Sequence, residues 1–371
     1  MAGTVPMITP GSITAIRGLS KRPVYFLNLN GAAQPNLVVK GEDALVHVSD
    51  ADAEISIKWS SKLMKNVNNT AVNTKIMALP EINLFKASAR LAYPLNTTPQ
   101  HQNLNANYRW VKMPYVAGLS DGEMWNEDHE GYDNQMIKNV VKKFMEPQVW
   151  TDLGKVVAVD IFNGNNDRFM FTQQPGYTIA QMTVAWANKG NIMFLHGGAT
   201  AVIGLDTVDP SSQTGPSNLG TGAADLAVLQ VLQAAHVGER AGFAVKCAHA
   251  VAAEISSAMR NTQFLTIRIN GAPLGQDILR VDKDHVDELL EPFAVPFEQG
   301  LNTGIQDLRQ YLQGKVQQYR QQNQLAQQQY QQRIGWRPGR IGAGPPIGVN
   351  RGPAMKTVPQ GVLDRMAFLG W

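Results

Sequence analysis

The feature that constrains the fold most is a change in hydrophobic pattern near Gly118. Before it, short runs rich in Val, Ile, Tyr and Phe, separated by Gly, Pro and Asn, predict β-strands, and residues 13–40 predict a three-stranded antiparallel start. After it, longer segments carry apolar residues at helical spacing. Strands followed by helices predict an α+β protein with a β-rich first part and an α-rich second part.

One helix is expected inside the β-rich part. Ser49 and Asp50 are residue types that cap a helix amino terminus. Four apolar residues then recur at every fourth position and share one helix face: Ile55, Trp59, Leu63 and Val67. Residues 74–82 and 108–119 are two further strand candidates.

The α-rich part begins with two helices, over residues 133–163, that meet near Pro147. Short strands are expected next, over residues 176–195 and 200–206. Three more helices complete the prediction, over residues 217–237, 244–260 and 283–299.

The last sixty residues divide by composition. Residues 313–332 contain eleven glutamines, which predicts a long, solvated helix with a thin apolar stripe or, alternatively, an oligomerising coiled coil. The Gly/Pro-rich basic stretch that follows predicts a flexible linker, and the final residues are apolar again. We expect this apolar plug to dock in a groove of the α-rich part or on a second copy. The expected divisions are residues 10–117, 118–312, 313–333, 334–358 and 359–371.

Composition bounds the class of protein. With 44% hydrophobic and 17% charged residues, most of the 371-residue chain is expected to fold. Residues 333–371 carry six basic side chains and one acidic side chain, so the rest of the chain has a net charge of −2 and gives no indication of a nucleic-acid groove. A single cysteine, Cys247, excludes an internal disulfide. No apolar run approaches the roughly 18 residues of a membrane span, so we expect a cytoplasmic protein or one secreted into a host cell without a cleavable signal peptide.

Four polar residues at the junctions of apolar segments indicate a possible catalytic site. Asp167 and Arg168 follow a helix in "NGNNDRF", Asn191 begins the apolar strand "NIMF", and Asp206 ends the next strand in "VIGLD". Phosphoryl transfer from ATP needs such a set, because one carboxylate orients and deprotonates the attacking hydroxyl while an Asn and an Asp hold Mg²⁺. The interpretation assigns Asp167 to the first role, and Asn191 and Asp206 to the second.

Phosphoryl transfer also needs a positively charged side chain near the phosphate oxygens of ATP. Lys40 ends the strand "NLVVK" and is expected to neutralise phosphate oxygens, and Glu54 on the following helix is expected to hold Lys40 by an ion pair. Asp160, on the helix before the loop, is interpreted as a buried structural acid that hydrogen-bonds the loop, and Arg168 as a brace for it. Alternatively, "NGNNDR" is an ordinary turn and Lys40 is an ordinary solvated lysine.

The same residues resemble a known family. "NNDRF", "NIMF" and an apolar strand ending in Asp look like the catalytic core of phosphoinositide kinases and their large protein-kinase relatives, and the Asn-Asp loop is also similar to that of HipA-type toxin kinases and secretory-pathway kinases. The resemblance covers roughly residues 10–210 and implies a bilobal kinase-like fold that binds ATP and Mg²⁺.

The resemblance also assigns residues in the first part. "GLSKRPVYFLNL" is similar to the family's first hairpin, which implies that Ser20 and Lys21 contact phosphate. "VKMPYVAGL" is similar to a kinase hinge, which implies that backbone groups near Met113, Tyr115 and Val116 bond adenine.

The chain departs from the family pattern in spacing. The catalytic Asp and the metal-binding Asn of the family are five residues apart, whereas 24 positions separate Asp167 from Asn191. Residues 169–188 must therefore form an inserted hairpin that returns the chain to the site. Phe169 replaces the family's histidine, and Thr207 follows Asp206 where the family has phenylalanine.

Three functions remain open. The first is a kinase, in the style of a bacterial toxin or secreted effector. A protein Ser/Thr hydroxyl is favoured as its acceptor, with a lipid as the alternative. The second keeps the fold but transfers AMP or does not react, as in a pseudokinase. The third is a non-enzymatic interaction protein that works through its Gln-rich helix and basic tail. The sequence has no P-loop, no H-E-x-x-H pair and no G-x-S-x-G elbow.

Overall fold

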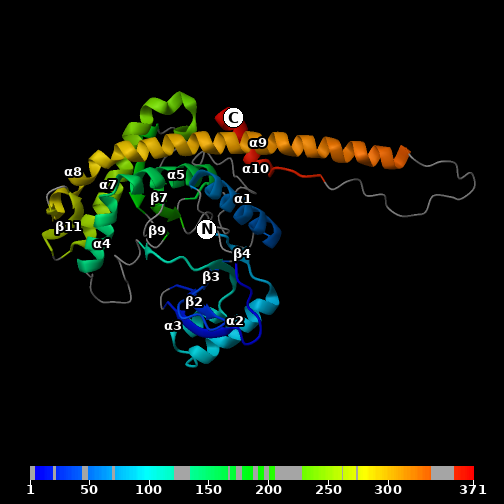
Figure 1. The fold of residues 1–371 in the computed structure, drawn as a ribbon, viewed down its shortest axis with the longest axis horizontal. Coiled ribbons are helices and arrows are strands. Elements are labelled where there is room, and N and C mark those ends of the chain that lie inside the picture. Colours follow the sequence, from blue (N-terminus) through cyan, green and yellow to red (C-terminus); the bar gives the residue numbers. More distant parts are fainter. Residues whose placement is uncertain are drawn as a thin grey trace, which may run out of the picture.

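The computed structural model describes residues 5–19, 22–43, 49–68, 72–120, 134–165, 168–172, 178–186, 191–195, 200–204, 228–260, 262–272, 275–335 and 355–371. The protein has the α+β composition that the sequence predicts, with helices and small antiparallel sheets. A five-stranded sheet and two helices form one region, and the remaining helices and smaller sheets form a second region above it in Figure 1.

The five-stranded sheet has the order β1-β2-β3-β5-β4 and is antiparallel throughout. Its strands are β1 (Ile13–Gly18), β2 (Val24–Leu29), β3 (Leu37–Asp43), β4 (Lys75–Ile76) and β5 (Tyr108–Pro114). The antiparallel three-stranded start predicted from the sequence is therefore confirmed. A tight turn at Asn30 and Gly31, both with positive φ, reverses the chain between β2 and β3.

The two faces of this sheet pack against different partners. One face carries Tyr25, Leu27, Val39 and Trp110, which form a core with Phe85 of α2 (Leu79–Ala92). The helix α3 (Pro99–Asn105) follows α2. The strand predicted over residues 74–82 is limited to β4, because Pro80 lies in the first turn of α2, where its missing N–H costs no hydrogen bond.

Helix α1 (Asp50–Asn68) lies between β3 and β4 in the sequence but packs on the second region. Trp59, Leu63 and Val67 are buried in the core of that region, as the periodicity predicts, whereas Ile55 is exposed. The Asn68 side chain donates a hydrogen bond to the Val202 carbonyl over 2.7 Å and so fixes the end of α1 to a strand of the second region.

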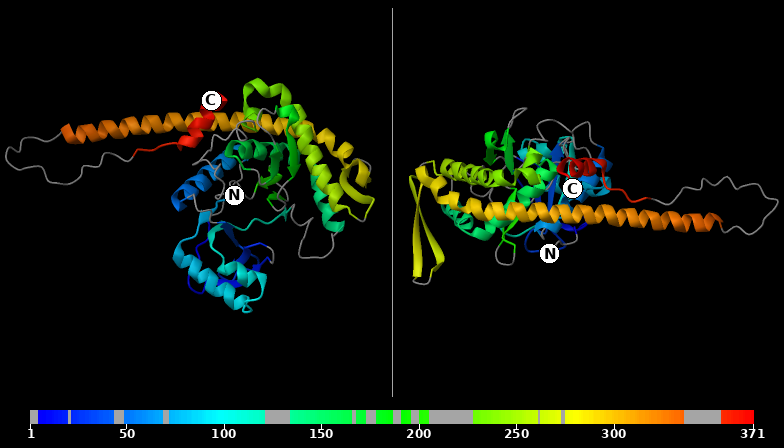
Figure 2. Two further views of the ribbon diagram at one scale, coloured as in Figure 1. Left: turned by 180° about the vertical axis from the view of Figure 1, so that it is seen from behind. Right: turned by 90° about the horizontal axis from the view of Figure 1, so that it is seen from above.

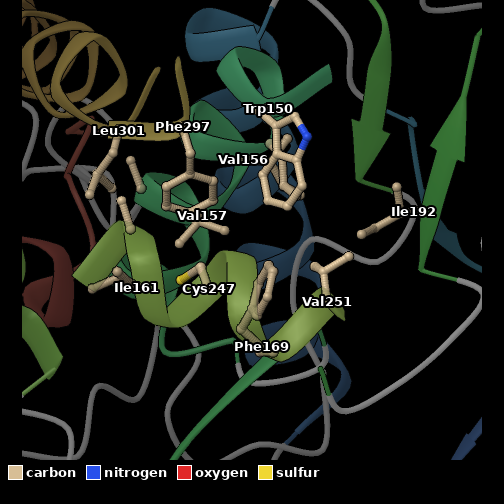
Figure 3. Close-up of a cluster of buried hydrophobic side chains, with 14 of the residues drawn as sticks. Trp150, Val156, Val157, Ile161, Phe169, Ile192, Cys247, Val251, Phe297 and Leu301 are labelled. Carbon is tan, nitrogen blue, oxygen red and sulfur yellow. The ribbon is translucent and has the colours of Figure 1, made fainter. Parts of the chain in front are cut away.

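The second region is built around two helices, α4 (Asn134–Phe144) and α5 (Pro147–Asn163), which meet at Pro147 as predicted. Helix α5 is buried on nearly all sides. Figure 3 shows its Trp150, Val156 and Val157 among side chains from neighbouring elements, with Cys247 of α7 (Arg240–Ala258) in the same core. Burial raises the pKa of the Cys247 thiol well above its usual range, so this thiol is inert.

Helix α9 (Ala294–Gly335) runs across α5 at very short distance. A Cβ atom at Gly300 would lie 1.9 Å from the Thr151 carbonyl oxygen, and one at Gly154 would lie 2.1 Å from the Phe297 carbonyl oxygen. Only glycine permits this approach at both positions. The carboxyl-terminal part of α9, which holds the glutamines, is helical as predicted and extends beyond the rest of the region (Figures 1 and 2).

Three small antiparallel sheets complete the second region. Strand β7 (Phe169–Thr172) pairs with β8 (Thr183–Trp186); β9 (Ile192–Phe194) pairs with β10 (Val202–Gly204) and β6 (Leu119–Ser120); β11 (Phe264–Ala272) pairs with β12 (Gly275–Asp282). The sequence interpretation did not include the last hairpin. The remaining short helices are η2 (Ile179–Gln181), η3 (Gln230–Leu232), η4 (Ala234–Glu239), η5 (Lys283–His285), α8 (Val286–Leu290) and η6 (Glu291–Phe293).

The apolar plug forms helix α10 (Gln360–Leu369) and docks on this chain, against α5 and α9. Val362, Met366 and Leu369 are buried in the core of the second region. This confirms docking on the α-rich part of the chain. Within the described residues, the structure contains no helix that combines the length and apolarity needed to cross a bilayer.

Candidate functional site

Arg168 is the centre of the candidate site. Its side chain is fully buried, and its Nε donates to Oδ2 of Asp160 over 2.6 Å, while its Nη2 pairs with Oδ1 of the same carboxylate. This is a bidentate, charge-assisted pair in the protein interior. Burial raises the pKa of Asp160, and the charge and hydrogen bonds of Arg168 oppose that shift. The Asp160–Arg168 pair fixes the end of α5 to the residue that follows Asp167 in the sequence.

The loop between these two residues is held by further bonds to Asp160. Gly164 ends α5 in the left-handed conformation, with φ 71°. The backbone N–H of Asn165 donates to the Asp160 carbonyl over 2.9 Å, and the Asn165 side chain donates to the Asp160 carboxylate over 3.2 Å. The structural role expected for Asp160 and the bracing role expected for Arg168 are therefore both confirmed.

Arg168 also lies against residues at the start of β9 and at the end of β10. Its Nη1 donates to the backbone carbonyl of Asn191 over 3.2 Å. A Cβ atom at Gly204, at the end of β10, would lie 3.0 Å from the guanidinium carbon of Arg168. The end of α5, the Asn191 carbonyl just before β9, and Gly204 at the end of β10 thus lie around a single guanidinium.

The long spacing between Asp167 and Asn191 is explained by a hairpin. Phe169 pairs with Trp186 and Thr172 pairs with Thr183, so β7 and β8 leave Arg168 and return to it. The inserted hairpin expected over residues 169–188 is confirmed by these pairs. Asn191 is buried, and its side-chain nitrogen has no hydrogen-bond partner among the residues that the structure describes. A buried donor of this kind is costly unless something accepts its hydrogen bond. The Asn191 side-chain nitrogen could therefore donate to a phosphate oxygen or to a carboxylate.

Lys40 lies on the sheet face that points toward these strands. Opposite it in the register is Val111, and Val38 lies opposite Met113. This face and the strand pair β9/β10 share one apolar cluster, which we call the interface cluster: Ile57, Val72, Val111, Met113, Met193 and Ile203, with Val38, Ile76, Val116 and Leu195 packed against it. Because side chains alternate along a strand, Met193 and Ile203 face the sheet while Ile192 and Val202 face the core of the second region.

The ion pair that the structure gives Lys40 is with Glu42, at 2.8 Å. Glu54 is exposed near the start of α1, and its pairing with Lys40 stays a prediction. A second lysine of the sheet, Lys112, is buried on the opposite face and pairs with the half-buried carboxylate of Glu81. The strand register distinguishes the two lysines: Lys40 faces β9 and β10, and Lys112 faces α2.

The expected hinge residues lie where β5 ends. Met113 is buried in the interface cluster and Val116 packs against that cluster. Tyr115 stacks edge-on against Phe26, and its backbone N–H donates to the Asn36 carbonyl over 3.2 Å. The Tyr115 N–H would have to break that bond to reach an adenine.

Four of the candidate residues lie outside the described residues: Ser20, Lys21, Asp167 and Asp206. Among the residues that are described, no group of three or more His, Cys, Asp or Glu side chains is arranged to hold a metal ion. The comparisons with known proteins give no match, whether with a family model, with a curated protein or with a solved structure.

Proposed function

We propose that this chain is an ATP- and Mg²⁺-dependent phosphotransferase with a bilobal, kinase-like fold, and that its acceptor is a Ser or Thr hydroxyl of a protein. In this proposal Asp167 orients and deprotonates the acceptor hydroxyl, and Asn191 and Asp206 hold the metal. Lys40, with Ser20 and Lys21, neutralises phosphate charge. ATP bound with Mg²⁺ supplies the phosphoryl group.

One observation carries the proposal: the Arg168 guanidinium bonds Asp160 and the Asn191 carbonyl, and touches Gly204. The contacts with the Asn191 carbonyl and with Gly204 fix the backbone at, or close in sequence to, the proposed metal ligands. Asn191 and Gly204 are thereby held in place before any substrate binds, and fixed groups of this kind favour catalysis. The position of Lys40 gives further support, since protein kinases also place their phosphate-binding lysine on the third strand.

A protein acceptor is favoured over a lipid by the packing of α4. This helix carries Lys138, Lys142 and Lys143 beside a strongly apolar face, the composition of a helix that lies on a membrane. Its apolar residues are fully buried in the core, so that face is not offered to a lipid surface.

The position of the transferred label tests the proposal. The chain is incubated with Mg²⁺, a cell lysate and ATP labelled at either the γ or the α phosphate. Transfer of the γ label alone supports phosphotransfer, whereas transfer of the α label means that the domain moves AMP. Transfer of neither label, with no change in melting temperature on adding Mg·ATP, favours an interaction protein.

The metal assignment has its own test. Asn191→Ala and Asp206→Ala should each abolish the rise in melting temperature that Mg·ATP produces while leaving the melting temperature of the free protein nearly unchanged. Asn66→Ala, on the exposed side of α1, is the matched control and should behave as the wild type. A wild-type response to Mg·ATP in both site variants would show that the metal assignment is wrong.

A further inference from the structure

The carboxyl end of α5 is capped by a side chain that lies more than two hundred residues away in the sequence. The last four carbonyls of any α-helix have no partner within the helix. In α5, the Asp160 carbonyl accepts from the N–H of Asn165 over 2.9 Å. The carbonyls of Ile161 and Phe162 accept from Nη1 of Arg365 in α10, over 3.1 Å and 2.6 Å.

The charge of Arg365 suits this position. Arg365 is buried, with a relative exposure of 4%, and its guanidinium faces the negative end of the α5 dipole. Hydrogen bonds from a charged donor are stronger than those between neutral groups. Arg365 therefore provides more than apolar packing at this point.

Two further contacts hold the carboxyl-terminal segment on the second region. The Trp371 ring stacks on the Phe162 ring, with centroids 5.7 Å apart and planes 1° from parallel. Gln233 donates to the Phe368 carbonyl over 2.9 Å. The first contact joins Trp371 to the last turn of α5, and the second joins α10 to the residue between η3 and η4.

The first carbonyl that Arg365 bonds belongs to Ile161, which follows Asp160 in the sequence. Asp160 and Arg168 hold the loop after α5 from within, and Arg365 holds the backbone just before that loop from the tail. We propose that Arg365 is a positioning residue, which caps α5 from the carboxyl-terminal helix and thereby fixes Gly164 and Asn165, the two residues that follow α5. The effect on turnover rests on the proposed function; the effect on the backbone does not.

Amide hydrogen exchange of the full-length chain tests the backbone effect without any assay of activity. Arg365→Gln should raise exchange at Gly164 and Asn165, whose N–H groups bond back to α5, by about tenfold or more. Exchange in β2 and β3 of the five-stranded sheet should stay the same. Arg365→Lys keeps a charged donor and should restore most of the protection. Asp364→Ala, exposed on the same helix, is the control.

Turnover then separates positioning from general stability. In Arg365→Gln, kcat should fall while KM for ATP stays within about twofold of the wild-type value, because the interaction affects the loop and not the nucleotide. Arg365→Lys should recover kcat. Wild-type exchange at Gly164 and Asn165 in Arg365→Gln would overturn the inference, and so would an equal rise throughout the second region. Local loss of protection without phosphotransfer in any variant, the wild type included, would support the inference and reject the proposed function.

Discussion

Arg168 and Asp160 form a buried bidentate ion pair, in which Nε of the arginine lies 2.6 Å from Oδ2 of the aspartate. Removing one partner of such a pair leaves an uncompensated charge in the interior. We expect Asp160→Asn and Arg168→Met each to lower the free energy of unfolding by about 3–5 kcal/mol, measured by urea denaturation. The double variant should lose clearly less than the two single losses combined. Strict additivity would mean that the two side chains act independently.

A second prediction concerns the close approach of α5 and α9. A methyl group at Gly300 would collide with the Thr151 backbone, so Gly300→Ala should cost about 1–3 kcal/mol or more, because the helices must move apart. Gly314, on the same helix, has no atom near its Cβ position, so Gly314→Ala is the control and should stabilise the protein by up to about 1 kcal/mol. Thermal unfolding of both variants measures the difference. Equal effects would contradict the packing described.

The third prediction concerns how the contribution of Glu81 to stability changes with pH. Burial alone would raise the pKa of Glu81, but hydrogen bonds from Lys112 and the Ile8 N–H, with the Lys112 charge, outweigh burial and hold that pKa below the ordinary value of 4.5. A lowered pKa in the folded state stabilises the protein above the unfolded pKa, and this contribution is lost as the pH falls through the lowered value. Glu81→Gln should therefore be less stable than wild type at pH 7.

The stability gap between the wild type and Glu81→Gln should narrow as the pH falls below about 4.5. Urea denaturation of both proteins between pH 7 and pH 3 measures this gap. A gap that stays constant, or that widens in acid, would contradict the assigned pKa direction.

The fourth prediction concerns Lys40, which pairs with Glu42 on a partly exposed part of the sheet. The two side chains are only 24% and 15% exposed, so Lys40→Ala takes a partner from a largely buried carboxylate and should lower the melting temperature while leaving the protein folded. On the proposed function, the same change should weaken Mg·ATP binding and lower kcat by about tenfold or more. Lys75→Ala, an exposed lysine on β4 of the same sheet, should leave both unchanged. Equal nucleotide binding in the two variants would show that Lys40 has no phosphate to neutralise.

Several strands and helices could be predicted from the pattern of apolar and polar residues within each segment. The strands β1 to β3, helix α1, and the pair α4 and α5 follow from alternation, periodicity and the break at Pro147. The strand predicted over residues 74–82 overlaps the first turn of α2, because the apolar run before Pro80 continues into that turn. The hairpin of β11 and β12 carried a usable signal, since Leu265 and Ile267 are buried at alternate positions between exposed residues.

The contacts that build the candidate site depend on tertiary packing. The spacing of the motif predicted that a hairpin returns Asn191 to the loop, but not that its backbone carbonyl would bond Arg168. Glu42 was missed as the partner of Lys40, although residues two apart on a strand share a face. Arg365 could not be linked to α5 from the sequence, because no local pattern relates positions 161 and 365.

The proposed phosphotransfer through Asp167 is tested by the variant Asp167→Asn. This change keeps the size of the side chain but removes the carboxylate that is proposed to orient and deprotonate the acceptor hydroxyl. The measurement is the rate of γ-phosphoryl transfer at saturating Mg·ATP, together with the affinity for Mg·ATP. We predict near-normal affinity and a transfer rate lower by on the order of 10²-fold or more. Transfer from Asp167→Asn at the wild-type rate would contradict the account.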